Sequence, residues 1–323
     1  MSDSSNLVYL SESTLEGLDI TTGEVVACLE NLIRGCAESR VWCAPKTAVS
    51  PPDGRYIMAT LSAADDPPFM AVKAVVLNPR NPQRGLPAIN SLITLLDSDT
   101  GKPIAVVDGN WVTAVRTAAA SALAAKHMAN ADASTLALIG CGVQGRSHLR
   151  AFTDCFPIKR VYALGRGPAN RDALCRSAEQ LGLSAIACDN AQEAVGEADI
   201  VITSTPLTAK LEPFLDARWL KPGAFVSALD LALPWIADSM SAFDRIIIDD
   251  LNQEAAMPDP MIDAKLVHGD LFGLVSGAIA GRSVKDERTA FVFRAVPLGD
   301  LGLAALAYQK AQASGSSQSS ILQ

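Results

Sequence analysis

The sequence has few of the features that mark nucleic-acid-binding or membrane proteins. Its 323 residues carry a net charge of −8, and Lys and Arg are spread along the chain without a basic run. Because nucleic acids and anionic membranes are bound through clustered positive charge, neither is an expected partner. No apolar stretch approaches the roughly 18 residues of a membrane helix, and the start MSDSSNLVYL lacks the pattern of a signal peptide.

Cysteine and histidine occur without the spacing of a metal site, so we expect no metal. No C-x-x-C pair is found, and the three histidines have no metal-ligand spacing to the seven cysteines. An odd cysteine count without a signal peptide predicts reduced, buried thiols in a cytoplasmic protein. His127 and His148 fall on predicted helices, where we expect them to pack or cap rather than to catalyse.

The composition predicts a folded protein with a sizeable core. Apolar residues make up 49% of the chain and charged residues 19%, which is typical of a compact domain and not of a disordered one. A chain of this length has room for two domains.

The most informative segment is LALIGCGVQGRSHL, residues 136–149. A short apolar run leads into a glycine-rich turn and then into helix-compatible sequence, which is the arrangement that binds the pyrophosphate of a dinucleotide. Gly140 allows the tight turn, Gly142 lets the backbone approach the phosphates, and Gly145 lets the helix pack on the strand. The N–H groups at the start of that helix then face the anion.

Strand and helix candidates alternate after residue 134, as βαβ units require. Helices are expected at 168–181 and 191–197. Strands are expected at 136–140, 160–166, 184–188, 199–205, 224–230, 245–250 and 290–294. Several of these strands are almost continuously apolar, which indicates a sheet buried on both faces. The prediction is an α/β fold with a doubly wound Rossmann domain over residues 117–293.

The first 115 residues predict a separate α+β domain. An amphipathic helix is expected at 22–39 and a long Ala-rich helix at 110–128. Between them lie β-rich segments with turn signals, at 46–50, 56–61, 70–77, 91–97 and 104–108. We expect the last helix, 298–313, to pack back on this domain. The substrate-binding domain is then discontinuous, 1–116 completed by 294–323, with the active site in a cleft between the domains.

Several motifs together resemble the ornithine cyclodeaminase/μ-crystallin family. The most specific is DGNWVTAVRTAAASALAAKHM (108–128), followed at fixed distance by GCGVQG. Further matches are LVYLSESTL, AVKAVVLNPRN, GLP, EADIVITSTP, KPGAFVSALD and GRSVKDERTAFVF, in family order over nearly the whole chain. The resemblance implies an NAD(P)-dependent oxidoreductase acting on amino acids or their cyclic imines, with a homodimer as the minimum assembly.

Within the family, the leading interpretation is a reductase of a cyclic imino acid. Substrates of this type are Δ1-pyrroline-2-carboxylate, Δ1-piperideine-2-carboxylate or a related ketimine, and the product is an L-amino acid. One alternative is an ornithine cyclodeaminase, which converts L-ornithine to L-proline and ammonia with bound NAD+. A second alternative, from another class, is an NADP(H)-binding protein without turnover.

Three basic residues are candidates for holding the substrate carboxylate. Arg116 lies in T-A-V-R-T, in a helix of small residues, and its guanidinium suits a bidentate carboxylate contact. Lys73 lies in the apolar run FMAVKAVVL, and we interpret this run as buried on both faces. The family resemblance makes both residues substrate contacts and gives Lys73 a possible proton-donor role. Lys46 stands where many members carry an arginine. The ordinary alternatives are a surface arginine and an outward-facing lysine.

Asp230 and Arg294 are further candidates. Asp230 ends the strand GAFVSALD, and the carboxyl ends of parallel strands line the ligand crevice. The resemblance makes it the general acid/base at the substrate nitrogen, and a turn or capping aspartate is the alternative. Arg294 departs from the family pattern F-D-S-x-G-x-x-x-x-D, where it replaces an acidic residue. It could bind a further anionic group of the substrate.

The expected cofactor is NADP(H), with NAD(H) possible. NAD-specific proteins place an acid after the second strand, but here Gly165 occupies that place and Arg166 follows. A guanidinium binds a 2′-phosphate, which a carboxylate would repel. The remaining expected cofactor contacts are Arg116, Thr117, Val143, Gln144, Ser204, Thr205 and Leu229.

Overall fold

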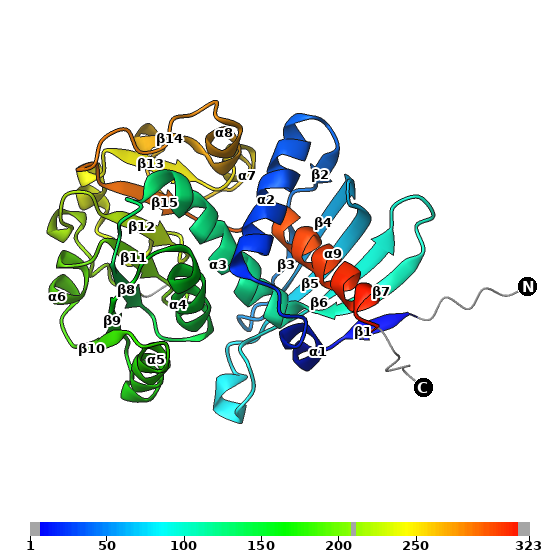
Figure 1. Cartoon of the computed structure of the whole chain (residues 1–323), viewed down its shortest axis with the longest axis horizontal. Coiled ribbons are helices and arrows are strands. Elements are labelled where there is room, and N and C mark those ends of the chain that lie inside the picture. Colours follow the sequence, from blue (N-terminus) through cyan, green and yellow to red (C-terminus); the bar gives the residue numbers. More distant parts are fainter. Residues whose placement is uncertain (1–6, 208–210, 316–323) are drawn as a thin grey trace, which may run out of the picture. The chain divides into compact units, whose positions relative to one another are not determined.

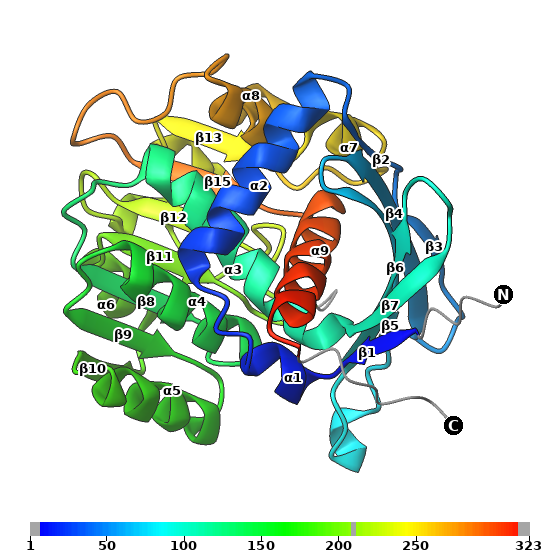
Figure 2. The same cartoon turned by 45° about the vertical axis from the view of Figure 1, so that its right-hand side comes forward.

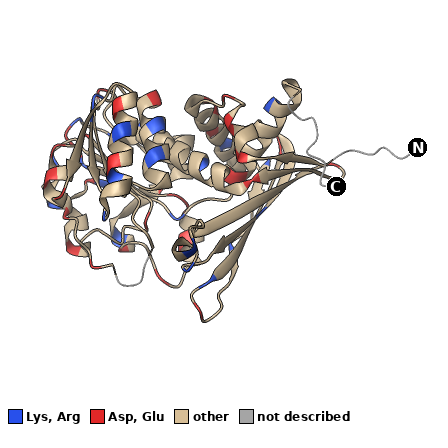
Figure 3. Ribbon diagram, turned by 90° about the horizontal axis from the view of Figure 1, so that it is seen from below, with Lys and Arg blue, Asp and Glu red and all other residues tan. Residues whose placement is uncertain are grey.

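The computed structural model describes residues 7–207 and 211–315. The chain forms two compact units, one running to Arg116 and resuming at Val296, the other comprising Thr117–Ala295. Acidic and basic residues are interspersed along the described helices and strands (Figure 3). Within these residues no helix is long and apolar enough to cross a membrane.

The first unit is built on a seven-stranded sheet in the described chain, in the order β1-β7-β6-β5-β4-β2, with β3 also pairing with β4. All its pairings are antiparallel except β1 with β7. The strands are β1 (Val8–Leu10), β2 (Val41–Cys43), β3 (Thr47–Val49), β4 (Tyr56–Asp65), β5 (Pro68–Leu77), β6 (Ile89–Asp97) and β7 (Pro103–Asp108). Sequence periodicity did not predict the three-residue strands β1 and β2.

Helix α9 (Leu298–Ala313) covers one face of this sheet, where it packs on β4, β5 and β6, and α2 (Thr22–Ala37) packs on α9 and β2 (Figure 2). The short helix α1 (Glu12–Glu16) follows β1. A capping box of Thr21 and Glu24 starts α2, which buries the apolar face predicted for it. Helix α3 (Gly109–Met128) begins in this unit, and the boundary after Arg116 falls within it.

The sequence suggested that the strand carrying Lys73 is buried on both faces. In the structure only one face of this strand is buried. Residues of β5 alternate between buried and exposed, and Lys73 is on the buried face, opposite Thr60 of β4. The run reads as continuously apolar because its outward residues Met70, Val72 and Val76 are apolar too, each 38% exposed. The error therefore reflects an apolar outer face of the sheet.

The second unit is a fully parallel sheet in the order β10-β9-β8-β11-β12-β15-β13-β14 (Figure 1). Its strands are β8 (Thr135–Ile139), β9 (Arg160–Leu164), β10 (Ser184–Cys188), β11 (Ile200–Thr203), β12 (Phe225–Ala228), β13 (Arg245–Ile248), β14 (Val267–Asp270) and β15 (Thr289–Val292). Helices α4 (Val143–Cys155), α5 (Pro168–Gln180), α6 (Ala191–Gly196), α7 (Leu251–Ala255) and α8 (Leu271–Ser276) connect them. Strand β15, the last in sequence, inserts between β12 and β13.

The strands at the centre of this sheet are buried on both faces, as their apolar runs predicted. Every residue of β11, β12 and β15 is buried. The sheet with its connecting helices is the doubly wound Rossmann arrangement expected for this half of the chain. The expectation of buried thiols is confirmed for Cys141 and Cys188 and is wrong for Cys43 and Cys155, which are exposed; the other three cysteines, Cys28, Cys36 and Cys175, are half-buried.

Candidate active site

The glycine turn after β8 has the geometry that close approach requires. Gly140 has φ +107°, and a Cβ on it would lie 2.5 Å from the Ser204 carbonyl oxygen. A Cβ on Gly145 would lie 2.3 Å from the carbonyl oxygen of Gly140, whereas a Cβ on Gly142 would meet nothing within 4 Å. The first and third glycines are therefore needed for packing, and the second leaves the backbone open to a ligand.

Helix α4 starts at this turn without a side-chain cap among the described residues, since its N-cap is Gly142. Its first turn consists of Val143, Gln144 and Gly145, and Val143 is 59% exposed. Uncapped N–H groups and the positive end of the helix dipole fit an anion such as a pyrophosphate.

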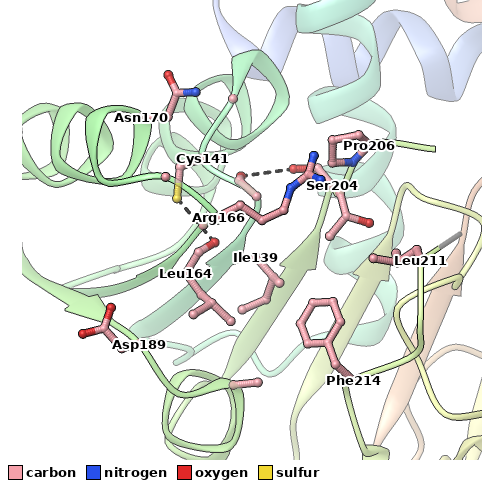
Figure 4. Close-up of a pocket in the computed structure, with 16 residues that line it drawn as sticks. Ile139, Cys141, Leu164, Arg166, Asn170, Asp189, Ser204, Pro206, Leu211 and Phe214 are labelled. Atoms are coloured by element: carbon pink, nitrogen blue, oxygen red, sulfur yellow. Dashed lines mark hydrogen bonds between the residues drawn. The ribbon is translucent and has the colours of Figure 1, made fainter. Parts of the chain in front are cut away.

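A pocket of about 530 Å³ lies against the turn, at the carboxyl ends of β8, β9 and β11 (Figure 4). Five of the predicted cofactor residues line it, namely Gly140, Gly142, Arg166, Ser204 and Thr205. Cys141, Asn170, Asp189 and Phe214 also line it and were not predicted, although Cys141 lies inside the glycine motif. Leu229 follows β12 and donates its N–H to the Thr203 carbonyl, and Thr117 is buried in α3.

The charges at this pocket belong to Arg166 and Asp189. Arg166 directly follows Gly165 after β9, so no acid stands at that place. The carboxylate of Asp189 forms an ion pair with Arg171 of α5, which offsets its negative charge. Arg166 is therefore the charged side chain of the lining that is suited to bind an anionic group of a ligand.

Asp230 is almost fully buried just after β12, with 1% of its surface exposed. Its carboxylate accepts hydrogen bonds from the Thr203 hydroxyl (2.8 Å), the Thr205 N–H (2.9 Å) and the Thr205 hydroxyl (3.0 Å). Burial raises the pKa of Asp230, although these hydrogen bonds oppose the shift. Thr205 lines the pocket, so Asp230 contacts the pocket lining through Thr205. Its hydrogen bonds hold Thr205 in place.

In the other unit, Lys73 and Arg116 meet at a buried aspartate, Asp300 of α9. The Lys73 ammonium donates to Asp300 Oδ1 at 2.8 Å and to the Thr113 hydroxyl at 2.6 Å, and Arg116 Nε lies 3.0 Å from Asp300 Oδ1. The three side chains are 2%, 8% and 4% exposed. A Cβ on Gly299 would already lie 3.2 Å from Arg116 Cδ, so glycine there makes room for the arginine.

Two buried cations, Lys73 and Arg116, meet at Asp300 in this cluster. Lys46 also acts electrostatically on Asp300. Burial raises the pKa of Asp300, but Arg116 and Lys73 outweigh burial and hold it below its usual value.

Burial lowers the pKa of Lys73 to about 8, with Asp300 opposing and Arg116 reinforcing the shift. Between pH 8 and its ordinary pKa of 10.5, the folded state therefore binds fewer protons here than the unfolded state. By linkage, the contribution of Lys73 to the free energy of unfolding rises with pH in this window and is lost as pH falls through 8.

We therefore expect the unfolding free energy of the wild type to rise between pH 8 and 10.5 relative to that of Lys73→Met, by about 3 kcal/mol at most. Urea unfolding of both proteins across this range measures the difference, in which other titrating groups cancel. A difference that stays flat or falls would contradict the depressed pKa.

Asp300 is the residue of this cluster that sequence reasoning missed. It lies in the first turn of α9, in the run LGDLGLAALA, and that stretch of the helix is buried all round. An acid in such a helix needs a cationic partner, so the signal was present in the sequence.

Arg294 has partners within its own unit. Its Nε lies 2.9 Å from Glu254 Oε2, an Nη donates to the Asp259 carbonyl, and its backbone N–H donates to Asp249. The pair with Glu254 is largely buried, so the guanidinium has a structural role, and its assignment to the substrate stays a prediction. No group of three or more potential metal ligands occurs among residues 7–207 and 211–315.

Comparison with known proteins places these features in one family. The family model described as "Ornithine cyclodeaminase/mu-crystallin family" matches residues 7–315. Rat ketimine reductase mu-crystallin is 31% identical over 257 residues, covering 78% of this chain and 79% of the relative.

Two solved structures resemble the fold over almost its whole length. Thermococcus litoralis Δ1-pyrroline-2-carboxylate reductase, in complex with NADH and L-proline, has a TM-score of 0.88 at 27% identity and covers 96% of this chain and 98% of its own. An archaeal alanine dehydrogenase dimer with bound NAD has a TM-score of 0.85 at 26% identity, covering 96% and 97%. The chain belongs to the ornithine cyclodeaminase/mu-crystallin family.

Proposed function

We propose that the chain reduces a cyclic imino acid to an L-amino acid with a reduced nicotinamide dinucleotide. The substrates we infer are Δ1-pyrroline-2-carboxylate, Δ1-piperideine-2-carboxylate or a related ketimine. The observation that carries the proposal is the buried cluster of Lys73, Arg116 and Asp300, in which an ammonium and a guanidinium, both groups that bind carboxylates, meet at one carboxylate oxygen. The similarity to a reductase crystallised with NADH and L-proline supports it.

In this proposal Arg116, Lys73 and Lys46 hold the carboxylate, Arg116 by its planar fork of donors. A bound reduced nicotinamide supplies the hydride for the carbon of the C=N bond. The nitrogen then takes a proton from a protein group. Asp230 suits this task because burial raises its pKa, and Lys73 suits it because its pKa of about 8 lies near neutrality.

The glycine turn and α4 fit the dinucleotide, with Gly140, Gly142 and Gly145 around the pyrophosphate. The contacts of Asp230 with Thr203 and Thr205 support a second, structural role for this residue next to the pocket.

We further propose a preference for NADP(H) over NAD(H), based on Arg166. Arg166→Asp is expected to lower the ratio of kcat/KM for NADPH to that for NADH by about 10²-fold, because a carboxylate repels the 2′-phosphate and accepts from the ribose 2′-hydroxyl. Initial rates with both cofactors give this ratio. Arg176→Asp, also on the surface of this unit but outside the pocket, is the matched control. An unchanged ratio in Arg166→Asp would refute the assignment.

We propose that the chain forms a homodimer through the outer face of the first unit's sheet. The large exposed side chains of that face are apolar. Its exposed side chains come from five strands and are Trp42, Val49, Ile57, Leu61, Met70, Val72, Val76 and Leu92, each between 38% and 63% exposed. Patches of this kind mark protein interfaces, and the similar alanine dehydrogenase is a dimer.

Val72→Arg is expected to convert the dimer into a monomer, because it places a charge at the centre of this face opposite Leu61. Light scattering after size-exclusion chromatography measures the mass. Gln309→Arg, on an exposed position of α9, is the matched control and should stay dimeric. A dimer that survives Val72→Arg unchanged would mean that the copies associate elsewhere.

A panel of imines and amino acids with both cofactors tests the activity. We expect oxidation of NADPH with Δ1-pyrroline-2-carboxylate or Δ1-piperideine-2-carboxylate. Ammonia release from ornithine with only catalytic NAD+ would identify a cyclodeaminase instead. Binding of NADPH with no turnover on either kind of substrate would identify a protein that binds the dinucleotide without catalysis.

A further inference from the structure

Helix α4 is tied to two other elements by a chain of buried hydrogen bonds centred on His148, which is fully buried. His148 Nδ1 lies 2.7 Å from the Gln144 carbonyl oxygen, and its Nε2 lies 3.0 Å from the Ser121 hydroxyl. The Ser227 hydroxyl in turn lies 2.9 Å from that of Ser121. Ser121 and Ser227 are 0% exposed, so these groups are shielded from bulk solvent.

The direction of each hydrogen bond between Gln144, His148, Ser121 and Ser227 can be assigned from the chemistry of the groups. A carbonyl oxygen can only accept, so Nδ1 carries the proton and donates to Gln144. Burial lowers the pKa of His148 to about 4, so the ring is neutral and Nε2 accepts from the Ser121 hydroxyl. Because the Ser121 hydroxyl already donates its hydrogen to His148, it can only accept a hydrogen bond from the Ser227 hydroxyl. One tautomer and one order of donors satisfy the whole chain.

The hydrogen-bond chain joins three elements that carry or lead into proposed cofactor contacts in this unit. Gln144 is in the first turn of α4, directly after the glycine turn. Ser121 lies one helical turn after Thr117 in α3, and Ser227 is in β12, two residues before Leu229. On the side facing β8, the contact between Gly145 and the Gly140 carbonyl leaves α4 no room to move closer. The hydrogen bonds of His148 on one side and the close contact of Gly145 with Gly140 on the other together fix the position of the first turn of α4.

We propose that His148 is a positioning residue for dinucleotide binding: with Ser121 and Ser227 it holds the first turn of α4 so that its N–H groups stay directed at the pyrophosphate. The proposal deepens the proposed function and rests on it for the identity of the ligand. His148 touches no reacting atom in this account. Its loss is expected to weaken cofactor binding and leave the chemical step intact.

The test compares His148→Phe and Ser121→Ala with a matched control, Phe152→Leu. Phe152 is buried in the same helix and stacks on His148 with ring centroids 6.1 Å apart, but it has no polar atom in the chain. Its truncation therefore destabilises α4 without touching the hydrogen bonds. His148→Asn is the conservative variant, because its amide keeps a donor at the place of Nδ1.

We expect the Kd and the KM for NADPH to rise about tenfold in His148→Phe, as the loss of one well-made buried hydrogen bond implies, with kcat little changed. Ser121→Ala should shift them in the same direction, and His148→Asn should recover part of the loss. Phe152→Leu should leave the Kd unchanged at an equal loss of Tm.

Amide hydrogen exchange without cofactor gives a readout that does not depend on the ligand. The N–H groups of residues 146–149, which donate to the carbonyls of the first turn of α4, should exchange about tenfold faster in His148→Phe than in Phe152→Leu. If the wild type bound neither NADPH nor NADH, the proposed function would be wrong, while the exchange rates would still decide the positioning role. Equal shifts of exchange in His148→Phe and Phe152→Leu would reduce His148 to a core residue and overturn the proposal.

Discussion

Replacing Arg116 by methionine is expected to lower kcat/KM for a cyclic imino acid by about 10²- to 10⁴-fold, because two charge-assisted hydrogen bonds to the carboxylate are lost. The fold should survive, since Asp300 keeps the ammonium of Lys73 as its partner at 2.8 Å. Initial rates at varied substrate concentration give kcat/KM. Arg116→Lys should recover only part of the loss, because an ammonium keeps the charge without the bidentate geometry.

The sharpest control is a substrate that lacks the carboxylate. Δ1-Pyrroline offers the same ring and C=N bond as Δ1-pyrroline-2-carboxylate, so the two differ only in the group that we assign to Arg116. The wild type should strongly prefer the carboxylate, and Arg116→Met should lose that preference while its rate with Δ1-pyrroline stays near the wild-type value. An equal loss for both substrates would place Arg116 elsewhere in the reaction.

Replacing Asp300 by alanine is expected to cost about 3–5 kcal/mol of unfolding free energy, because Lys73 and Arg116 then stay buried without their carboxylate. Asp300 itself is 3% exposed, so solvent screens these charges little. Urea or guanidinium unfolding measures the loss, with an unchanged m value as the sign that the native fold is kept.

The double variant Asp300→Ala with Lys73→Met is the matched test of that explanation. It removes Lys73, one of the two buried cations that lose their carboxylate partner in Asp300→Ala. The double variant should therefore be more stable than Asp300→Ala alone. A loss below about 1 kcal/mol in Asp300→Ala would mean that water or other groups satisfy the cations, and that Asp300 is not the main partner of Lys73 and Arg116.

The sequence predicted the central strands of the parallel sheet well, for a physical reason. Residues of β11 and β12 are buried on both faces, so three of the four residues in each of the runs IVIT and FVSA are apolar and the strands are easily recognised. Strands β1 and β2 have three residues each and show no period. The insertion of β15 between β12 and β13 is a matter of tertiary pairing, which local pattern does not encode.

Local sequence pattern also does not show which side chains meet in the fold. This explains why the partners of Lys73 and Arg116, and those of His148, were missed. Lys73 and Arg116 stood out because each interrupts a run of small or apolar residues. Their common partner Asp300 is 227 positions from Lys73, and only folding brings them together. His148 is fully buried, as expected for a packing residue, but Ser121 and Ser227 of its hydrogen-bond chain come from α3 and β12 and could not be chosen from the sequence.

The misreading of β5 has a useful consequence. A strand with one buried face normally alternates between apolar and polar residues, but FMAVKAVVL does not, because Met70, Val72 and Val76 point outward. The irregular pattern that suggested burial on both faces is thus the sequence signature of the apolar outer face. In the proposed homodimer that face would be covered by a second copy.

The central claim, that the chain reduces the C=N bond of an imino acid, is tested most directly by following a labelled hydride. NADPH carrying deuterium on the transferred position of C4 is incubated with the wild-type protein and Δ1-pyrroline-2-carboxylate, and the product is examined by mass spectrometry and NMR. The account predicts L-proline with one deuterium on its α-carbon. Ammonia and L-proline formed from L-ornithine with catalytic NAD+, without net oxidation of NADPH by the imine, would contradict it.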